Sequence, residues 1–127
     1  MTSEEQRHEM AMSAMRNNDA RHKSNLETFL APALEYVQQD NFYAYAKAWH
    51  DYCEAEARRL GSRADTMEKY GIERYPHVNK ALEHDLLQQL AQALKARQEE
   101  AREERLKRET EQEVVPVQQS LFGEEVA

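Results

Sequence analysis

The sequence predicts an all-α protein: a small helical bundle with a long charged C-terminal helix and a disordered tail. Only three of the 127 residues are glycine and three are proline, which argues against collagen, sandwich and propeller architectures. Charged residues make up 32% of the chain, and apolar residues recur at helical spacing. We expect one helical domain over 1–95, a charged helical spacer over 96–112 and a flexible tail over 113–127.

The first helices are expected to begin at capping boxes. Ser3 and Gln6 have the spacing at which each side chain can satisfy a backbone amide of the other residue. The polar run 16–19 weakens this helix, so we expect it to end there. A second capping box at 24–27 opens another apolar segment, which Pro32 must kink or break because its ring removes an amide donor.

The segment 42–60 gives the clearest helical signal of the chain. It follows the start signal Asp40-Asn41, and its apolar residues are three or four positions apart: Phe42, Ala46, Trp49, Cys53, Ala57 and Leu60. We expect this stripe to face the core, with Cys53 as a small buried hydrophobe. Gly61 is expected to end the helix, and Gly71 to end a short helix that follows.

A long helix is predicted after Pro76. Its leucine-rich stripe is broad enough to face a core and consists of Val78, Leu82, Leu86, Leu90 and Leu94, widened by Ala81, Leu87 and Ala91. From residue 95 to 111 the helical composition continues with one large apolar residue, Leu106. Oppositely charged side chains four positions apart support an exposed helix in this stretch.

The charge of the chain bears on its partners. Acidic residues outnumber basic ones by 24 to 17, for a net charge of -7. A protein that grips duplex DNA needs a basic footprint, so this balance favours a protein-binding role or mimicry of nucleic acid. Residues 41–95 hold eight basic and eight acidic residues, and the argument against DNA contact is weaker there.

The tail contains the most specific signal, the run Gln118-Gln119-Ser120-Leu121-Phe122. No leucine occurs between Leu106 and Leu121, and no aromatic residue between Tyr75 and Phe122. An apolar pair in a segment too short to bury a core of its own is best explained by a pocket on another molecule. The sequence therefore predicts a peptide that docks on a partner.

These five residues resemble the short peptide by which many bacterial polymerases, repair proteins and regulators bind the sliding clamp, the beta subunit of DNA polymerase III. Gln118 matches the leading glutamine of that motif, and Ser120 its small polar position. Leu121 and Phe122 match its two hydrophobic anchors. The family usually has leucine where this chain has Gln119, so we expect weaker binding than for a full match.

The competing interpretation of the tail is a fold-back. In it the tail is amphipathic and buries Leu121 and Phe122 in a groove of its own helical body. The resemblance covers five residues and implies nothing about the 110 or so that precede them.

A cluster of aromatic residues at the start of the 42–60 segment has two interpretations. Tyr43, Tyr45 and Trp49 could stack on bases, as the aromatic side chains of single-strand binders do. Such platforms usually lie in a basic groove, and a helix with aromatics on several faces is more often packed between two others. We favour core packing.

The chain gives no sign of an enzyme, a cofactor or a metal. Three isolated glycines cannot form a phosphate-binding loop. Two groups could be mistaken for metal ligands, yet neither has the paired spacing of a structural zinc site: His50, Cys53 and Glu54, and His77, His84 and Asp85. No apolar run is long enough to span a bilayer, and the acidic N-terminus does not resemble a signal peptide, so we expect a cytoplasmic protein.

The sequence thus predicts a non-enzymatic adaptor or modulator of DNA replication or repair that binds the bacterial sliding clamp, a role that small acidic proteins encoded by phages or plasmids could fill. The helical body could bring another replication or repair protein to the clamp, or the tail could occupy the clamp and exclude other proteins. The alternative is a helical nucleic-acid-binding or DNA-mimic regulator whose tail is incidental. A third interpretation is a structural subunit that forms homo-oligomers through its long helix.

Overall fold

A computed structural model describes the backbone of residues 2–126 and the side chains of residues 2–112. Within these residues it contains helices and no strand, which confirms the predicted all-α bundle. The elements are α1 (Ser3–Asn25), the π-helical turn η1 (Leu26–Leu30), α2 (Ala31–Gln38), α3 (Phe42–Tyr70) and α4 (Lys80–Val126). The chain divides into two compact units, Met1–Ala91 and Gln92–Ala127.

Helix α1 begins one residue earlier than the predicted capping box and runs past the predicted end. The backbone amide of Glu5 donates to the Thr2 hydroxyl at 3.1 Å, and the Glu5 carboxylate accepts from the Thr2 amide at 3.4 Å. The polar run 16–19 does not end the helix, because Asn18 is buried and donates to the Arg59 carbonyl at 3.0 Å. Tertiary pairing thus offsets the weak local propensity of this stretch.

Pro32 widens the helix without ending it. Immediately before it lies the π-turn η1, where the Ala31 amide donates to the Leu26 carbonyl five residues back. A proline ring needs room against the preceding turn, and a π-turn supplies it. The widened turn still belongs to the core, because Leu26 and Leu30 are fully buried there.

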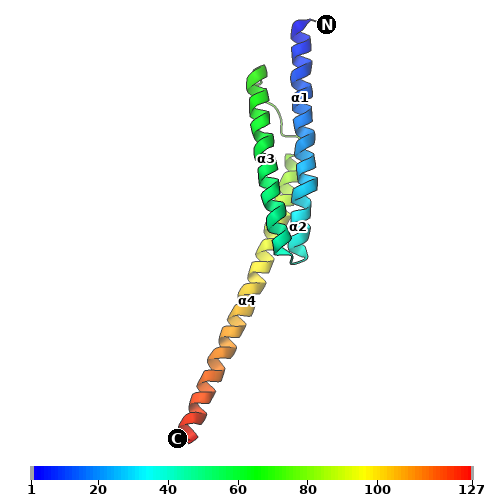
Figure 1. Ribbon diagram of the computed structural model, residues 1–127. Coiled ribbons are helices and arrows are strands. Elements are labelled where there is room, and N and C mark those ends of the chain that lie inside the picture. Colours follow the sequence, from blue (N-terminus) through cyan, green and yellow to red (C-terminus); the bar gives the residue numbers. More distant parts are fainter. Residues whose placement is uncertain (1, 127) are drawn as a thin grey trace. The chain divides into compact units, whose positions relative to one another are not determined.

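Helix α3 returns alongside α1 and α2, and α1 and α3 lie side by side (Figure 1). Its N-cap is Asn41, as predicted, whose side chain accepts from the Ala44 amide at 3.2 Å. The prediction that Gly61 ends this helix is wrong, since α3 continues to Tyr70. Gly71 ends it with a left-handed backbone (φ 65°) and a hydrogen bond from the Ile72 amide to the Met67 carbonyl.

Along α1, the buried polar residues of the first unit lie between two sets of buried apolar residues. The buried apolar residues of this unit are Ala11, Met15, Leu26, Leu30, Ala33, Leu34, Val37, Tyr52 and Leu90. Five polar or charged side chains are also buried: Asn18, His22, Glu56, Arg59 and Arg63. Helix α3 contributes mainly from the second set, so the side it turns toward α1 is polar.

The apolar stripe of α3 therefore does not face the core, contrary to the prediction. Phe42 and Leu60 are 47% and 48% exposed. Ala46, Cys53 and Ala57 are exposed as well, and Trp49 is half-buried. The stripe lies outward because the polar side chains on the other face of α3 find charged and hydrogen-bonding partners inside the bundle. Cys53 is accordingly not a buried hydrophobe.

The leucine stripe of α4 is only partly buried. Leu90 is 3% exposed and Leu82 38% exposed, and Val78, which precedes α4, is 59% exposed. Further along, all residues from 98 to 112 are exposed, including Leu106 at 49%. The predicted tail, 113–127, lies beyond the described side chains, and its flexibility stays a prediction.

Candidate functional site

The predicted site residues fall in two places. The clamp-motif residues Gln118, Ser120, Leu121 and Phe122 lie outside the residues whose side chains the structure describes. The aromatic candidates lie at the start of α3, where Tyr43 is 86% exposed and projects away from the core.

The other two aromatic candidates are half-buried. These are Tyr45 and Trp49. The centre of the Trp49 ring lies 5.5 Å from the centre of the Tyr52 ring, at an interplanar angle of 38°. The core-packing interpretation therefore holds in part for Tyr45 and Trp49 and is wrong for Tyr43.

A buried ion pair forms the centre of a polar network between α1 and α3. The Arg59 guanidinium donates to both oxygens of the Glu56 carboxylate, at 2.5 and 3.0 Å. A third donor nitrogen of Arg59 reaches Asn18 Oδ1 at 3.0 Å, and the Asn18 amide in turn donates to the Arg59 carbonyl. Arg59 is 2% and Glu56 7% exposed, so both charges are removed from water and each is the other's main partner.

His22 of α1 extends this network toward α4. Its Nε2 atom lies 3.2 Å from Glu56 Oε1 and 3.5 Å from Glu83 Oε1. The Tyr52 hydroxyl donates to the same Glu83 oxygen at 3.0 Å, and Asn25 donates to Glu56 at 3.1 Å. Nε2 is buried and makes no hydrogen bond of good geometry. A proton there would place a positive charge between the two carboxylates.

A second group of contacts ties the α3–α4 connection to α1. Arg63 donates to the Tyr75 carbonyl at 2.7 Å, and its guanidinium lies 5.3 Å from the centre of the Tyr75 ring. The Tyr75 hydroxyl donates to Asp19 at 2.9 Å, and Asn79 donates to the Asp19 carbonyl at 2.8 Å. These bonds hold the segment 72–79 against the bundle.

The sequence interpretation missed this network, although a signal for it was present. Tyr52, Glu56, Arg59 and Arg63 are spaced by four, three and four, the same helical period as the apolar stripe of α3. Two stripes of equal period therefore compete for the inward side of one helix. Apolarity alone favoured the stripe that the structure turns outward.

Two groups of side chains have metal-binding donors close together in the described part of the chain. In one of them, the donor atoms of His22, Glu56 and Glu83 lie within 4.8 Å of one another. Arg59 already donates to both Glu56 oxygens, and its positive charge opposes a divalent cation, so the set fits an ion-pair network better. The other group, His50, Asp51 and Glu54, lies on the outer side of α3, and exposed acidic groups are common in proteins without a bound metal.

The network makes stability depend on pH through Glu56. Burial alone would raise the pKa of this carboxyl, but hydrogen bonds from Arg59 and Asn25, with the charges of Arg59 and His22, outweigh it and hold the pKa below its ordinary 4.5. A carboxyl with a lowered folded-state pKa stabilises the fold above its unfolded-state pKa, and this contribution is lost as the pH falls through the folded value. We expect the stability gap between the wild type and Glu56→Gln to be constant at neutral pH and to shrink below pH 4.5.

Urea unfolding of both proteins from pH 7 to about 3 measures that gap. Glu54→Gln is the matched control, since Glu54 lies on the same helix with a side chain that is 53% exposed. A gap for Glu56→Gln that stays the same or widens in acid would contradict the assignment.

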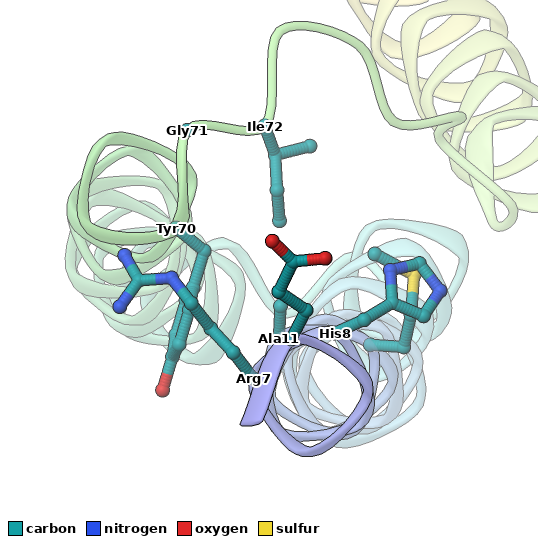
Figure 2. Close-up of a pocket in the computed structure, with 8 residues that line it drawn as sticks. Arg7, His8, Ala11, Tyr70, Gly71 and Ile72 are labelled. Carbon is teal, nitrogen blue, oxygen red and sulfur yellow. The ribbon is translucent and has the colours of Figure 1, made fainter. Parts of the chain in front are cut away.

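A shallow pocket of about 350 Å³ lies where the start of α1 meets the end of α3 (Figure 2). Arg7 and Tyr70 lie side by side in it, with the guanidinium 5.3 Å from the ring centre, and His8 lies on the other side of α1. Arg7 also donates to the Lys69 carbonyl at 2.7 Å, near the C-terminus of α3. A cation at that position satisfies a free carbonyl of the last turn, so these contacts fasten the two helix ends together.

Comparison of the chain with protein-family models, with curated proteins and with solved structures finds no match. Among the residues that the structure describes, no helix combines the length and apolarity needed to cross a membrane.

Proposed function

We propose that the protein is a non-enzymatic adaptor or modulator of DNA replication or repair that binds the bacterial sliding clamp through residues 118–122. The observation that carries this proposal is the run Gln118-Gln119-Ser120-Leu121-Phe122, four residues of which match the clamp-binding peptide. The helical body is the part that would be delivered to the clamp, or held there to exclude other proteins.

The chemistry of the four matching residues supports such docking. Leu121 and Phe122 would enter an apolar cleft, each contributing about 1.5–3 kcal/mol when fully buried. Gln118 both donates and accepts hydrogen bonds and can fix the register at a second subsite. Ser120 is small enough for the backbone to approach the clamp surface closely.

The segment before the motif supports the proposal in a second way. Residues 98–112 of α4 are helical and exposed, with alternating charges such as the Glu104–Arg108 pair at 3.3 Å. At 1.5 Å per residue, these positions extend the chain by roughly 22 Å. A charged helix of this length can act as a spacer between a docking peptide and a folded body.

Truncation of one anchor tests the proposal. We expect Phe122→Ala to weaken binding of the full-length chain to purified clamp by roughly 10- to 150-fold, because the alanine leaves the apolar cleft unfilled. Fluorescence anisotropy or calorimetry with the clamp measures the dissociation constant.

Val126→Ala is the control, since it removes apolar atoms from the same tail outside the motif. Equal affinity of the wild type and Phe122→Ala, or no binding by either, would reject clamp docking through this peptide.

A further inference from the structure

We propose that the protein forms a symmetric dimer in which the outer faces of two α3 helices pack antiparallel, with Cys53 on the twofold axis. The outer face of α3 consists of Phe42, Ala46, Trp49, Cys53, Ala57, Leu60 and Ala64. The proposal does not depend on the clamp peptide, and it names a second copy of this chain as the occupant of that face.

Among the residues whose side chains the structure describes, the outer face is apolar and largely exposed, with Trp49 half-buried beside Tyr52. Phe42 and Leu60 are half-exposed, and the small residues between them, Ala46, Cys53 and Ala57, are exposed. From Phe42 to Ala64, α3 rises about 33 Å. An apolar strip of that length on the surface of a small helical domain is typical of an interaction surface.

The order of side-chain sizes along this face indicates what covers it. Phe42 and Ala64 each lie eleven residues from Cys53, on opposite sides. Ala46 and Leu60 each lie seven residues from it, and Trp49 and Ala57 four. In every one of these pairs a large side chain is matched with a small one.

This pattern is the one that a twofold axis requires. When two identical helices pack antiparallel about an axis at Cys53, residues equally distant from Cys53 lie opposite each other across the interface. Each large side chain then meets an alanine of the other copy, so that the two surfaces interdigitate at close distance. A partner of unrelated sequence would not require sizes to be paired about one residue.

The exposed flank of the same face is also self-complementary. Tyr43 is 86% exposed and lies within two residues of the position that faces Gly61 of the second copy. Gly61 has open space beside it, since a Cβ added there would meet nothing within 4 Å. His50 of one copy likewise lies within two residues of the position that faces Glu54 of the second copy. Both side chains are exposed, and within one chain they are 3.3 Å apart. Two residues along a helix correspond to about 3 Å, which these side chains can span. A bulky ring thus meets a glycine, and an imidazole meets a carboxylate.

Cross-linking of the full-length chain tests both the dimer and its register. Cys53 is the single cysteine, and we expect oxidation with copper phenanthroline to link two copies through it. For the register, Ala46→Cys and Leu60→Cys are each made in a Cys53→Ser background. We expect neither chain to cross-link alone, whereas a mixture of the two gives a covalent dimer.

The expected result in solution is a dimer by sedimentation equilibrium that Leu60→Asp converts to a monomer across the concentration range. Leu82→Asp is the matched control, because Leu82 is also partly exposed but lies on α4. Circular dichroism establishes that both variants keep their helicity.

Three outcomes would overturn the proposal: a wild-type chain that is monomeric at all concentrations, equal loss of the dimer in both variants, or cross-linking of Ala46→Cys chains with one another. Failure of clamp binding would leave these measurements unaffected.

Discussion

Replacing Arg59 by methionine is expected to lower the free energy of unfolding by about 3–5 kcal/mol, the usual cost of breaking a buried ion pair by removing one partner. The substitution leaves the Glu56 carboxylate buried without its bidentate partner and takes a donor from Asn18 Oδ1. Because Glu56 is only 7% exposed, water cannot take the place of the guanidinium. Denaturant unfolding at neutral pH measures the loss.

Arg58→Met is the control for that variant. Arg58 is the neighbouring residue on α3, its side chain is 76% exposed, and its ion pair with Glu54 is 3.8 Å long. We expect a change within about 0.5 kcal/mol, as is usual for a surface substitution. A loss for Arg59→Met no larger than that for Arg58→Met would contradict the role of the network.

The double variant Glu56→Met with Arg59→Met separates the two components of that cost. Removing both charges eliminates the uncompensated carboxylate, so we expect the double variant to be more stable than Arg59→Met alone. The difference between the two variants measures the penalty of an unpaired buried charge.

Truncation of Leu30 to alanine is expected to lower the free energy of unfolding by about 2–5 kcal/mol. Leu30 is fully buried at the π-turn, where α1 passes into α2 and packs against α3. The bulged backbone before Pro32 leaves the neighbouring residues little freedom to close around the cavity. The loss should therefore lie in the upper part of that range, and thermal or urea unfolding measures it.

Leu60→Ala provides the comparison, measured at concentrations at which the chain is monomeric. Leu60 is 48% exposed, so alanine there removes fewer buried atoms and opens no closed cavity. A Leu60→Ala loss equal to that of Leu30→Ala would mean that the outer face of α3 is covered within one chain, which would also contradict the proposed dimer.

The fold class and several helix ends could be predicted from local chemistry. Asn41 and Gly71 act through short-range hydrogen bonds and a left-handed backbone. A helix start at Asp40-Asn41 and a helix end at Gly71 were predicted, although the helix that Gly71 ends is α3 and not a separate short one. The predicted helix end at Gly61 was wrong, because glycine permits a helix to end but does not force it to. The polar run 16–19 stays helical through Asn18, whose partner is 41 residues away along the chain.

The orientation of α3 and its polar network could not be predicted for a related reason. The free energy of burying Glu56 depends on whether Arg59 is beside it, and the reverse holds for Arg59. Both also depend on Asn18 and His22, and no local sequence pattern shows whether these partners meet. Apolarity, in contrast, is a property of single residues, so the apolar stripe was assigned to the core. The resemblance at 118–122 could be noticed because such a peptide motif is local in sequence, and its docking stays a prediction.

The positions of the apolar and polar parts of the core along the chain have a consequence for folding kinetics. The larger set of buried apolar residues lies near the turn between α2 and α3, where Leu30 and Val37 are close in sequence to the start of α3. The ion-pair network joins α1 to α3 across 41 residues. Closing the shorter loop costs less entropy, so we expect the helical hairpin to form from the turn and the ion pairs to close after the rate-limiting step. Loss of Arg59 would then mainly raise the unfolding rate and leave the folding rate almost unchanged. The buried charges would thus set how long each molecule stays folded.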